Sequence, residues 1–96
     1  MNAKHIVKKV TIIGAGNVGH NFGKAFRQAG YIINEIYSRT QKSAMLLSQT
    51  LNCDYTTDLT KIKKDSDLYI LAVNDDALES VIENITILDK IISIFL

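Results

Sequence analysis

The chain has 96 residues, a length that suits one small domain. Its composition is 47% hydrophobic and 22% charged, which is ordinary for a soluble globular protein. The formal net charge of +1 argues against a nucleic-acid-binding surface, because such a surface needs clustered lysine and arginine. No segment approaches the roughly 20 apolar residues of a membrane span, and Met1–Lys9 lacks the apolar run of a signal peptide. The single cysteine, Cys53, cannot form an internal disulfide. We therefore expect a cytoplasmic protein that binds neither nucleic acid nor membrane.

The first predicted element is a buried strand that runs into a glycine turn. The strand lies within Ile6–Ile13, from about Lys9, and is rich in valine and isoleucine with little alternation, as is typical of a central parallel strand. All five glycines of the chain lie between Gly14 and Gly30, and there is no proline. Glycine permits positive φ and the close approach of a ligand or another backbone, so this concentration indicates a local requirement.

The pattern Gly14-x-Gly16-x-x-Gly19 follows the strand directly. In a dinucleotide-binding turn, Gly14 would allow the tight turn, Gly16 would leave room for a pyrophosphate, and Gly19 would let a helix pack closely. The free N–H groups of the helix's first turn also suit phosphate. The first part of the predicted cofactor site is therefore Gly14, Ala15, Gly16, Asn17, Val18 and Gly19. The alternative is a purely structural turn, which the flanking strand and helix patterns disfavour.

A helix is predicted over about Asn17–Ala29, with Gly30 as its C-terminal stop. Its apolar residues at helical spacing, which we predict to form the buried face, are Val18, Phe22, Ala25, Phe26 and Ala29. Gly23 lies one turn after Gly19. A glycine inside a helix costs about 1 kcal/mol relative to alanine, so close packing against the sheet is expected there.

The second predicted strand, Tyr31–Tyr37, leads to Ser38, Arg39 and Thr40. In this kind of fold the end of the second strand meets the adenosine ribose, where an acid binds the 2′-hydroxyl of NAD and arginine accommodates the 2′-phosphate of NADP. No acid lies at this tip, since Glu35 comes three residues earlier. Arg39 can bind phosphate through two N–H groups. NADP is therefore favoured over NAD; the alternative is a plain loop in which Thr40 caps the next helix.

The remaining segments continue the alternation of strands and helices. We predict a helix from about 40 or 41 to 51, a short edge strand over 52–55, a helical turn over 58–62, a strand over 68–73, a helix over 75–85 and a strand over 90–96. This order indicates an α/β, Rossmann-type, mostly parallel sheet with helices on both faces, the first strand central and the second beside it. Ligands bind such sheets at the carboxyl ends of the strands, so Ala72, Val73 and Asn74 complete the predicted cofactor site.

Three segments, Thr11–Gly19, Tyr37–Thr40 and Leu71–Ala77, together resemble the NADP-binding half of a group of reductases. The group includes pyrroline-5-carboxylate reductase, the F420-dependent NADP oxidoreductases and related Rossmann-like proteins of unknown substrate. The resemblance covers nearly the whole chain, although those families often have proline in place of Asn74. It implies an oxidoreductase that transfers hydride between NADPH and a small substrate. Family members continue into a helical second domain, so we expect residues 1–96 to be the N-terminal half only, truncated before that domain.

The sequence shows no acid–base pair, metal cluster or activated nucleophile, and its only histidines are His5 and His20. No catalytic residue is therefore predicted, and the chain alone is expected to bind its cofactor without turnover. The alternative is a non-catalytic nucleotide-binding or regulatory module, which would use the same glycines. A methyltransferase would normally need an acid at the end of the second strand. An apolar last strand would leave an uncovered edge, which predicts a homodimer or aggregation.

Overall fold

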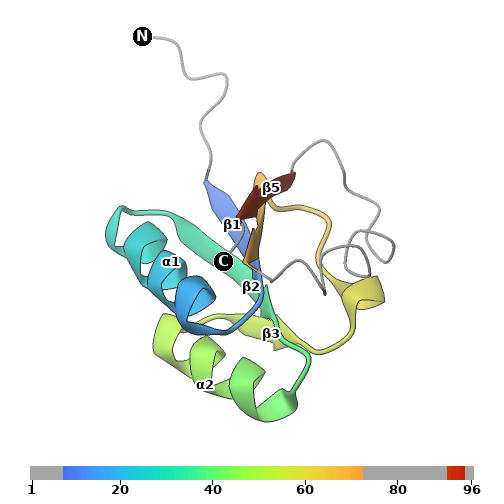
Figure 1. Cartoon of the computed structure of the whole chain (residues 1–96). Helices are drawn as coiled ribbons and strands as arrows, with labels where there is room; N and C mark the ends of the chain where they lie inside the picture. The colour runs from blue at the N-terminus through green and yellow to red at the C-terminus, as the bar shows by residue number, and fades with distance from the viewer. Residues whose placement is uncertain (1–7, 73–90, 95–96) are drawn as a thin grey trace, which may run out of the picture.

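The computed structural model describes residues 8–72 and the backbone of residues 91–94. In these ranges five strands form one parallel sheet with the order β3-β2-β1-β4-β5 (Figure 1). The strands are β1 (Lys9–Ile13), β2 (Ile32–Tyr37), β3 (Asp54–Thr56), β4 (Leu68–Ala72) and β5 (Ile91–Ile94). The helices are α1 (Asn17–Gln28), α2 (Gln41–Leu51) and the 3-10 turn η1 (Leu59–Lys61). The predicted Rossmann-type sheet is confirmed, with β1 at its centre and β2 beside it.

The position of β1 explains why the strand is mostly apolar. It pairs with β2 on one side and with β4 on the other, and Val10, Ile12 and Ile13 are fully buried. Ile12 belongs to the core beneath the helices, whereas its neighbour Ile13 packs with Tyr37 and Leu71 on the opposite face. Because successive side chains of a strand point to opposite faces, both faces of β1 need apolar residues.

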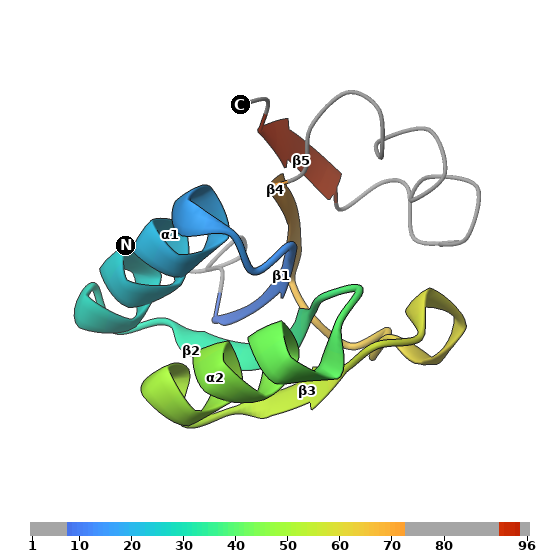
Figure 2. The same ribbon diagram turned by 60° about the horizontal axis from the view of Figure 1, so that its bottom comes forward.

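Both described α-helices cover the same face of the sheet, where they lie side by side (Figure 2). From α2, Ala44, Leu47 and Leu51 pack into this core. On the other face, Ile62 after η1 covers Tyr37 and Leu71. The helix predicted over 75–85, which would complete the cover of that face, lies outside the described residues.

The predicted buried face of α1 is partly wrong. Ala25 and Ala29 are exposed, and the two fully buried residues of the helix are Gly19 and Gly23. A Cβ added at Gly23 would lie 2.6 Å from Leu51 Cδ1 and 3.3 Å from Ile12 Cδ1. The helix therefore approaches the sheet through its glycines.

The short edge strand is confirmed but begins later than predicted. Asn52 ends α2 in the left-handed region, at φ 53°, and its N–H donates to the Ser48 carbonyl. Asparagine tolerates this conformation at a helix C-terminus, so the chain turns at Asn52 before β3 starts at Asp54.

Candidate dinucleotide site

The glycine turn is fixed between the ends of β1 and β2. Gly14 has φ 120°, a conformation that L side chains rarely adopt, and its N–H donates to the Tyr37 carbonyl at 2.8 Å. The turn therefore starts at the carboxyl ends of two neighbouring parallel strands. Ligands of open α/β sheets bind at this edge.

Gly16 and Gly19 have different structural environments, as their predicted roles require. A Cβ added at Gly16 would have no protein atom within 4 Å, whereas one at Gly19 would lie 2.0 Å from the Gly14 carbonyl oxygen. Gly19 thus allows α1 to contact the turn, and Gly16 leaves its outer side open. Gly16 is also the N-cap of α1, which has no side-chain cap and no acid in its first turn. The start of α1 is therefore suited to an anion.

The segment after β2 contains the second group of predicted residues. Ser38 is buried, and its N–H donates to the Thr56 carbonyl at 3.3 Å. Arg39 is exposed. Thr40 caps α2, since its Oγ1 accepts the Ser43 N–H at 3.3 Å. Thr40 therefore caps α2, which was one of the two roles considered for it. It is also the residue directly after Arg39.

Glu35, near the end of β2, is buried and bonded within the chain. It is only 5% exposed, and its Oε1 accepts the Lys63 N–H at 2.8 Å. Burial raises the pKa of Glu35 above its usual range, although the Lys63 N–H and ammonium group oppose this shift. The carboxylate nearest in sequence to Arg39 is thus engaged by the segment that follows η1.

The third part of the predicted site lies only partly within the described residues. Ala72 is the last residue of β4 and is buried. Val73 and Asn74 lie outside the described residues. Because β4 runs parallel to β1 and pairs with it, Ala72 is at the same edge of the sheet as the glycine turn.

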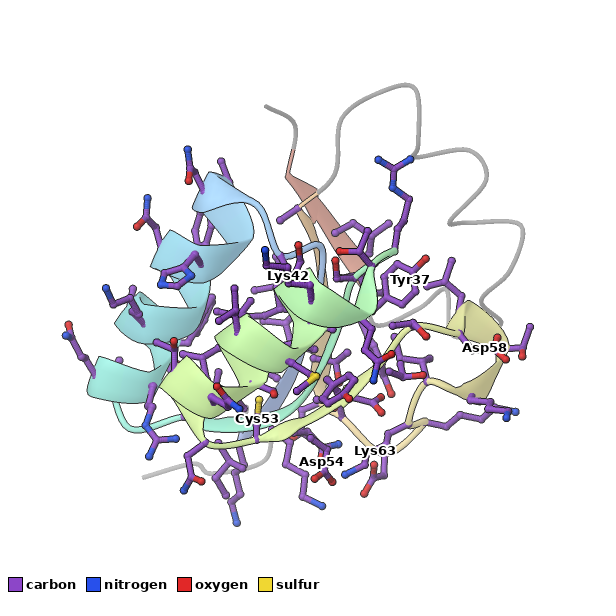
Figure 3. All side chains as sticks on the ribbon, turned by 90° about the horizontal axis from the view of Figure 1, so that it is seen from below. Tyr37, Lys42, Cys53, Asp54, Asp58 and Lys63 are labelled. Atoms are coloured by element: carbon purple, nitrogen blue, oxygen red, sulfur yellow. The ribbon has the colours of Figure 1, made fainter. Side chains whose placement is uncertain are left out.

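Sequence reasoning overlooked one cation close to this edge. Lys42 lies in the first turn of α2, three residues after Arg39, and it is exposed. Figure 3 shows Lys42 and Tyr37 toward the start of α2, away from Cys53 near the helix's other end. Lys42 could have been identified from the sequence, because it lies in the first turn of a predicted helix, where acidic residues are usual.

The described residues contain no cluster of three His, Cys, Asp or Glu side chains suited to a metal ion. In the same part of the chain, no helix has the length and apolar character needed to cross a bilayer. Burial raises the pKa of the Cys53 thiol to about 11, which disfavours the thiolate, the reactive form.

Together, the glycine turn, the start of α1 and the carboxyl ends of β1, β2 and β4 define a Rossmann domain of the NADP oxidoreductase type. The chain belongs to the family described as NADP oxidoreductase, coenzyme F420-dependent, whose model matches residues 9–94. A comparison with curated protein sequences gives no match.

Solved structures show the same fold. A Bacteroides fragilis protein described as an NADP oxidoreductase has 32% identity and a TM-score of 0.75, over 91% of this chain and 35% of its own. Pyrroline-5-carboxylate reductase of Coxiella burnetii has 20% identity and a TM-score of 0.80, over 95% and 36%. The imine reductase of Myxococcus stipitatus in complex with NADP+ has 22% identity and a TM-score of 0.73, over 91% and 32%. The chain thus spans about a third of the length of these proteins.

These similar structures contain both forms of the cofactor. A variant of the Myxococcus stipitatus imine reductase was solved with NAD+, and the enzyme was also solved with NADP+. Structures that share the fold are thus found with both nicotinamide dinucleotides.

Proposed function

We propose that this chain is the NADP(H)-binding domain of an oxidoreductase that transfers hydride between NADP(H) and a small substrate. The observation that carries the proposal is the charge at the carboxyl end of β2. Arg39 is exposed there, and Glu35 is buried and bonded to the Lys63 backbone. A 2′-phosphate would meet a cation at this position, and Glu35, the acid nearest to Arg39 in sequence, is already bonded within the chain.

Each part of the site has a role in this proposal. The outer side of Gly16 and the first N–H groups of α1 hold the pyrophosphate. Ser38, Arg39 and Thr40 hold the 2′-phosphate, and Ala72 with Val73 and Asn74 lines the path toward the nicotinamide. When bound, the cofactor supplies the hydride chemistry, and the residues of this chain bind and orient it.

We propose further that the 96-residue chain binds the cofactor without turning over a substrate. The described residues offer no activated nucleophile, since the pKa of Cys53 is raised, and no group of metal ligands. A non-catalytic nucleotide-binding module would use the same glycine turn. If a longer gene product bound NADPH but did not oxidise it, this result would favour the non-catalytic module. The homodimer and the cytoplasmic location stay predictions.

The test is a calorimetric titration of the chain with NADPH and NADH, repeated with Arg39→Gln, Arg39→Lys and Lys24→Gln. Lys24 is exposed on α1 and matches Arg39 in charge. We expect at least about tenfold tighter binding of NADPH, lost in Arg39→Gln and partly kept in Arg39→Lys, because lysine cannot form the two-bond contact. NADH affinity should stay constant in all variants. Equal affinity for the two cofactors, or an Arg39→Gln variant that keeps the NADPH preference, would contradict the proposal.

A further inference from the structure

The outer face of α2 exposes apolar side chains and almost no charge. Lys42 is the one charged residue of the helix. Leu46 is 57% exposed and Met45 is 39% exposed, and no other helix or strand that the structure describes lies across this side of α2 (Figure 2). Exposed helix faces are normally covered by charged and polar residues, so this face is unusual for one that meets only water.

Leu46 is central to this face in two ways. It is the middle residue of α2, with five residues on each side between Gln41 and Leu51. With about 3.6 residues per turn, it also lies opposite the buried residues of the helix, Ala44, Leu47, Ser48 and Leu51. Lys42 and Gln49 share its side of the helix. Beside them, the Thr50 hydroxyl donates to the Leu46 carbonyl at 3.0 Å, so this hydroxyl is already bonded within the helix.

The charges of α2 suit an antiparallel pair of helices better than a single helix. Its first turn holds Lys42 and no acid, and Lys42 forms no ion pair with another described residue. Its last turn holds no basic residue, although Arg27 of α1 donates to the Leu51 carbonyl there. A cation is unfavourable at the positive N-terminal end of its own helix and favourable at the negative C-terminal end of another.

We propose that this face of α2 binds a second copy of this chain, with the two α2 helices antiparallel and the two-fold axis beside Leu46. A two-fold axis brings the same surface of both copies together, so the two Leu46 side chains meet. Lys42 of each copy lies beside Gln49, in the last turn of the other helix. The two Lys42 charges are about 10 Å apart along the helices, beyond the Debye length of about 8 Å at physiological salt.

The properties of the face favour a second copy over a charged partner. An acidic partner would find a single cation here, whereas a copy supplies both the apolar contact and the helix end that Lys42 lacks. Two short helices cover little area, and small interfaces belong to weak complexes. We therefore expect a dissociation constant on the order of 0.1–1 mM. The proposal does not depend on the function proposed above, since it requires no bound cofactor.

The first test is sedimentation equilibrium from about 10 μM to 1 mM, the range that brackets the expected constant. Leu46→Lys should raise the dissociation constant at least about tenfold, because it removes the central apolar contact and places two like charges at the axis. Leu46→Gln, which adds no charge, should weaken the dimer less. The control is Ile32→Thr on β2, since Ile32 is also 57% exposed, and its association should match that of the unmodified chain. Melting temperatures at low concentration verify that each variant is folded.

The second test, disulfide cross-linking in a Cys53→Ser background, determines the orientation of the helices. Leu46→Cys should form a covalent dimer under mild oxidation, because bridged cysteines need Cα atoms within about 7 Å. Lys42→Cys alone should not, whereas a mixture of Lys42→Cys and Gln49→Cys should form the mixed dimer.

Three results would overturn the proposal. The first is a chain that stays monomeric at about 1 mM, above the expected constant. The second is a dimer that Leu46→Lys leaves unchanged, because its contact would then lie elsewhere. The third is a Lys42→Cys chain that cross-links with itself more readily than with Gln49→Cys, because the helices would then be parallel.

Discussion

A β-carbon on Gly19 would lie 2.0 Å from the carbonyl oxygen of Gly14, so the first and third glycines of the turn are in direct backbone contact. The second glycine has no such neighbour, since a Cβ at Gly16 would meet no protein atom within 4 Å. Gly16 also has φ −76°, which any residue adopts. The motif thus combines two glycines that the fold requires with one that the fold leaves open.

This difference predicts opposite results for two alanine substitutions. Gly19→Ala should destabilise the chain by about 1–3 kcal/mol or more, because backbone must move to admit the methyl group. Gly16→Ala should change stability by less than about 1 kcal/mol, the scale of a changed N-cap residue. It should nevertheless weaken NADPH binding, because its methyl group would occupy the open side of the turn. Urea denaturation and calorimetry check the two parts. If the Gly16→Ala variant had unchanged NADPH affinity, this would show that the pyrophosphate does not bind on this side of the turn.

A buried hydroxyl pair leads to a second prediction. Thr11 Oγ1 and Ser66 Oγ are 2.5 Å apart, both residues are fully buried, and Asn34 Nδ2 donates to Ser66 Oγ at 2.8 Å. Ser66→Ala would leave the Thr11 hydroxyl without its partner. We expect a loss of about 1–3 kcal/mol in the free energy of unfolding, the cost of an unsatisfied buried polar group.

The double variant Thr11→Val with Ser66→Ala is the control for this pair. It removes both hydroxyls, so its destabilisation should be smaller than the sum of the two single variants. Urea denaturation of all four proteins gives the coupling energy. Strict additivity would mean that the short contact between Thr11 and Ser66 contributes nothing to stability.

Much of this architecture could be predicted from the sequence, and the reason is physical. The strand in which Val10, Ile12 and Ile13 lie is buried on both faces, and such strands are rich in apolar residues that identify them. The glycine turn was recognisable because Gly14 and Gly19 are required by backbone geometry within the chain itself. Local chemistry also determined the start of α2, where Thr40 was considered as a cap and is one.

Features that depend on distant segments could not be predicted in the same way. The spacing of Ala25 and Ala29 indicates a buried face, whereas both residues are exposed and the helix approaches Leu51 at Gly23. Glu35 was set aside for its distance along the strand, whereas its actual partner is Lys63, on a segment distant in sequence. The proposed preference for NADP over NAD rests on Arg39, and periodicity does not encode what an exposed side chain binds.

The burial of Glu35 gives a third prediction, on pH. Its pKa is raised in the folded chain, mainly by desolvation, so the folded state holds this proton more tightly than the unfolded state. This contribution to stability is present in acid and is lost as the pH rises from the ordinary glutamate range through the raised value. Glu35→Gln keeps an acceptor for the Lys63 N–H and removes the charge. We therefore expect it to be more stable than the unmodified chain at pH 7, with the advantage lost at pH 4.

Asp58 is the matched control, because its shift has the opposite sign. Hydrogen bonds from the Thr60 hydroxyl and N–H lower the pKa of this exposed carboxyl. Asp58→Asn should therefore be less stable than the unmodified chain at pH 7, and the difference should vanish as the pH falls below the carboxyl range. Urea denaturation at several pH values measures both variants. A Glu35→Gln variant that is destabilised equally at pH 4 and pH 7 would contradict the assigned cause.

The last prediction concerns the reactivity of Cys53. Burial raises its pKa from 9.0 to about 11, with a smaller contribution from the negative charge of Asp54. Only the thiolate reacts with disulfide reagents or iodoacetamide, so at pH 8 the native chain should react about 100-fold more slowly than the chain unfolded in urea. Asp54→Asn should speed the native reaction modestly, because it removes a negative charge that opposes the thiolate. The rate is followed with a chromogenic disulfide at pH 8. Equal rates in native and unfolded protein would show that the thiol is neither desolvated nor shielded.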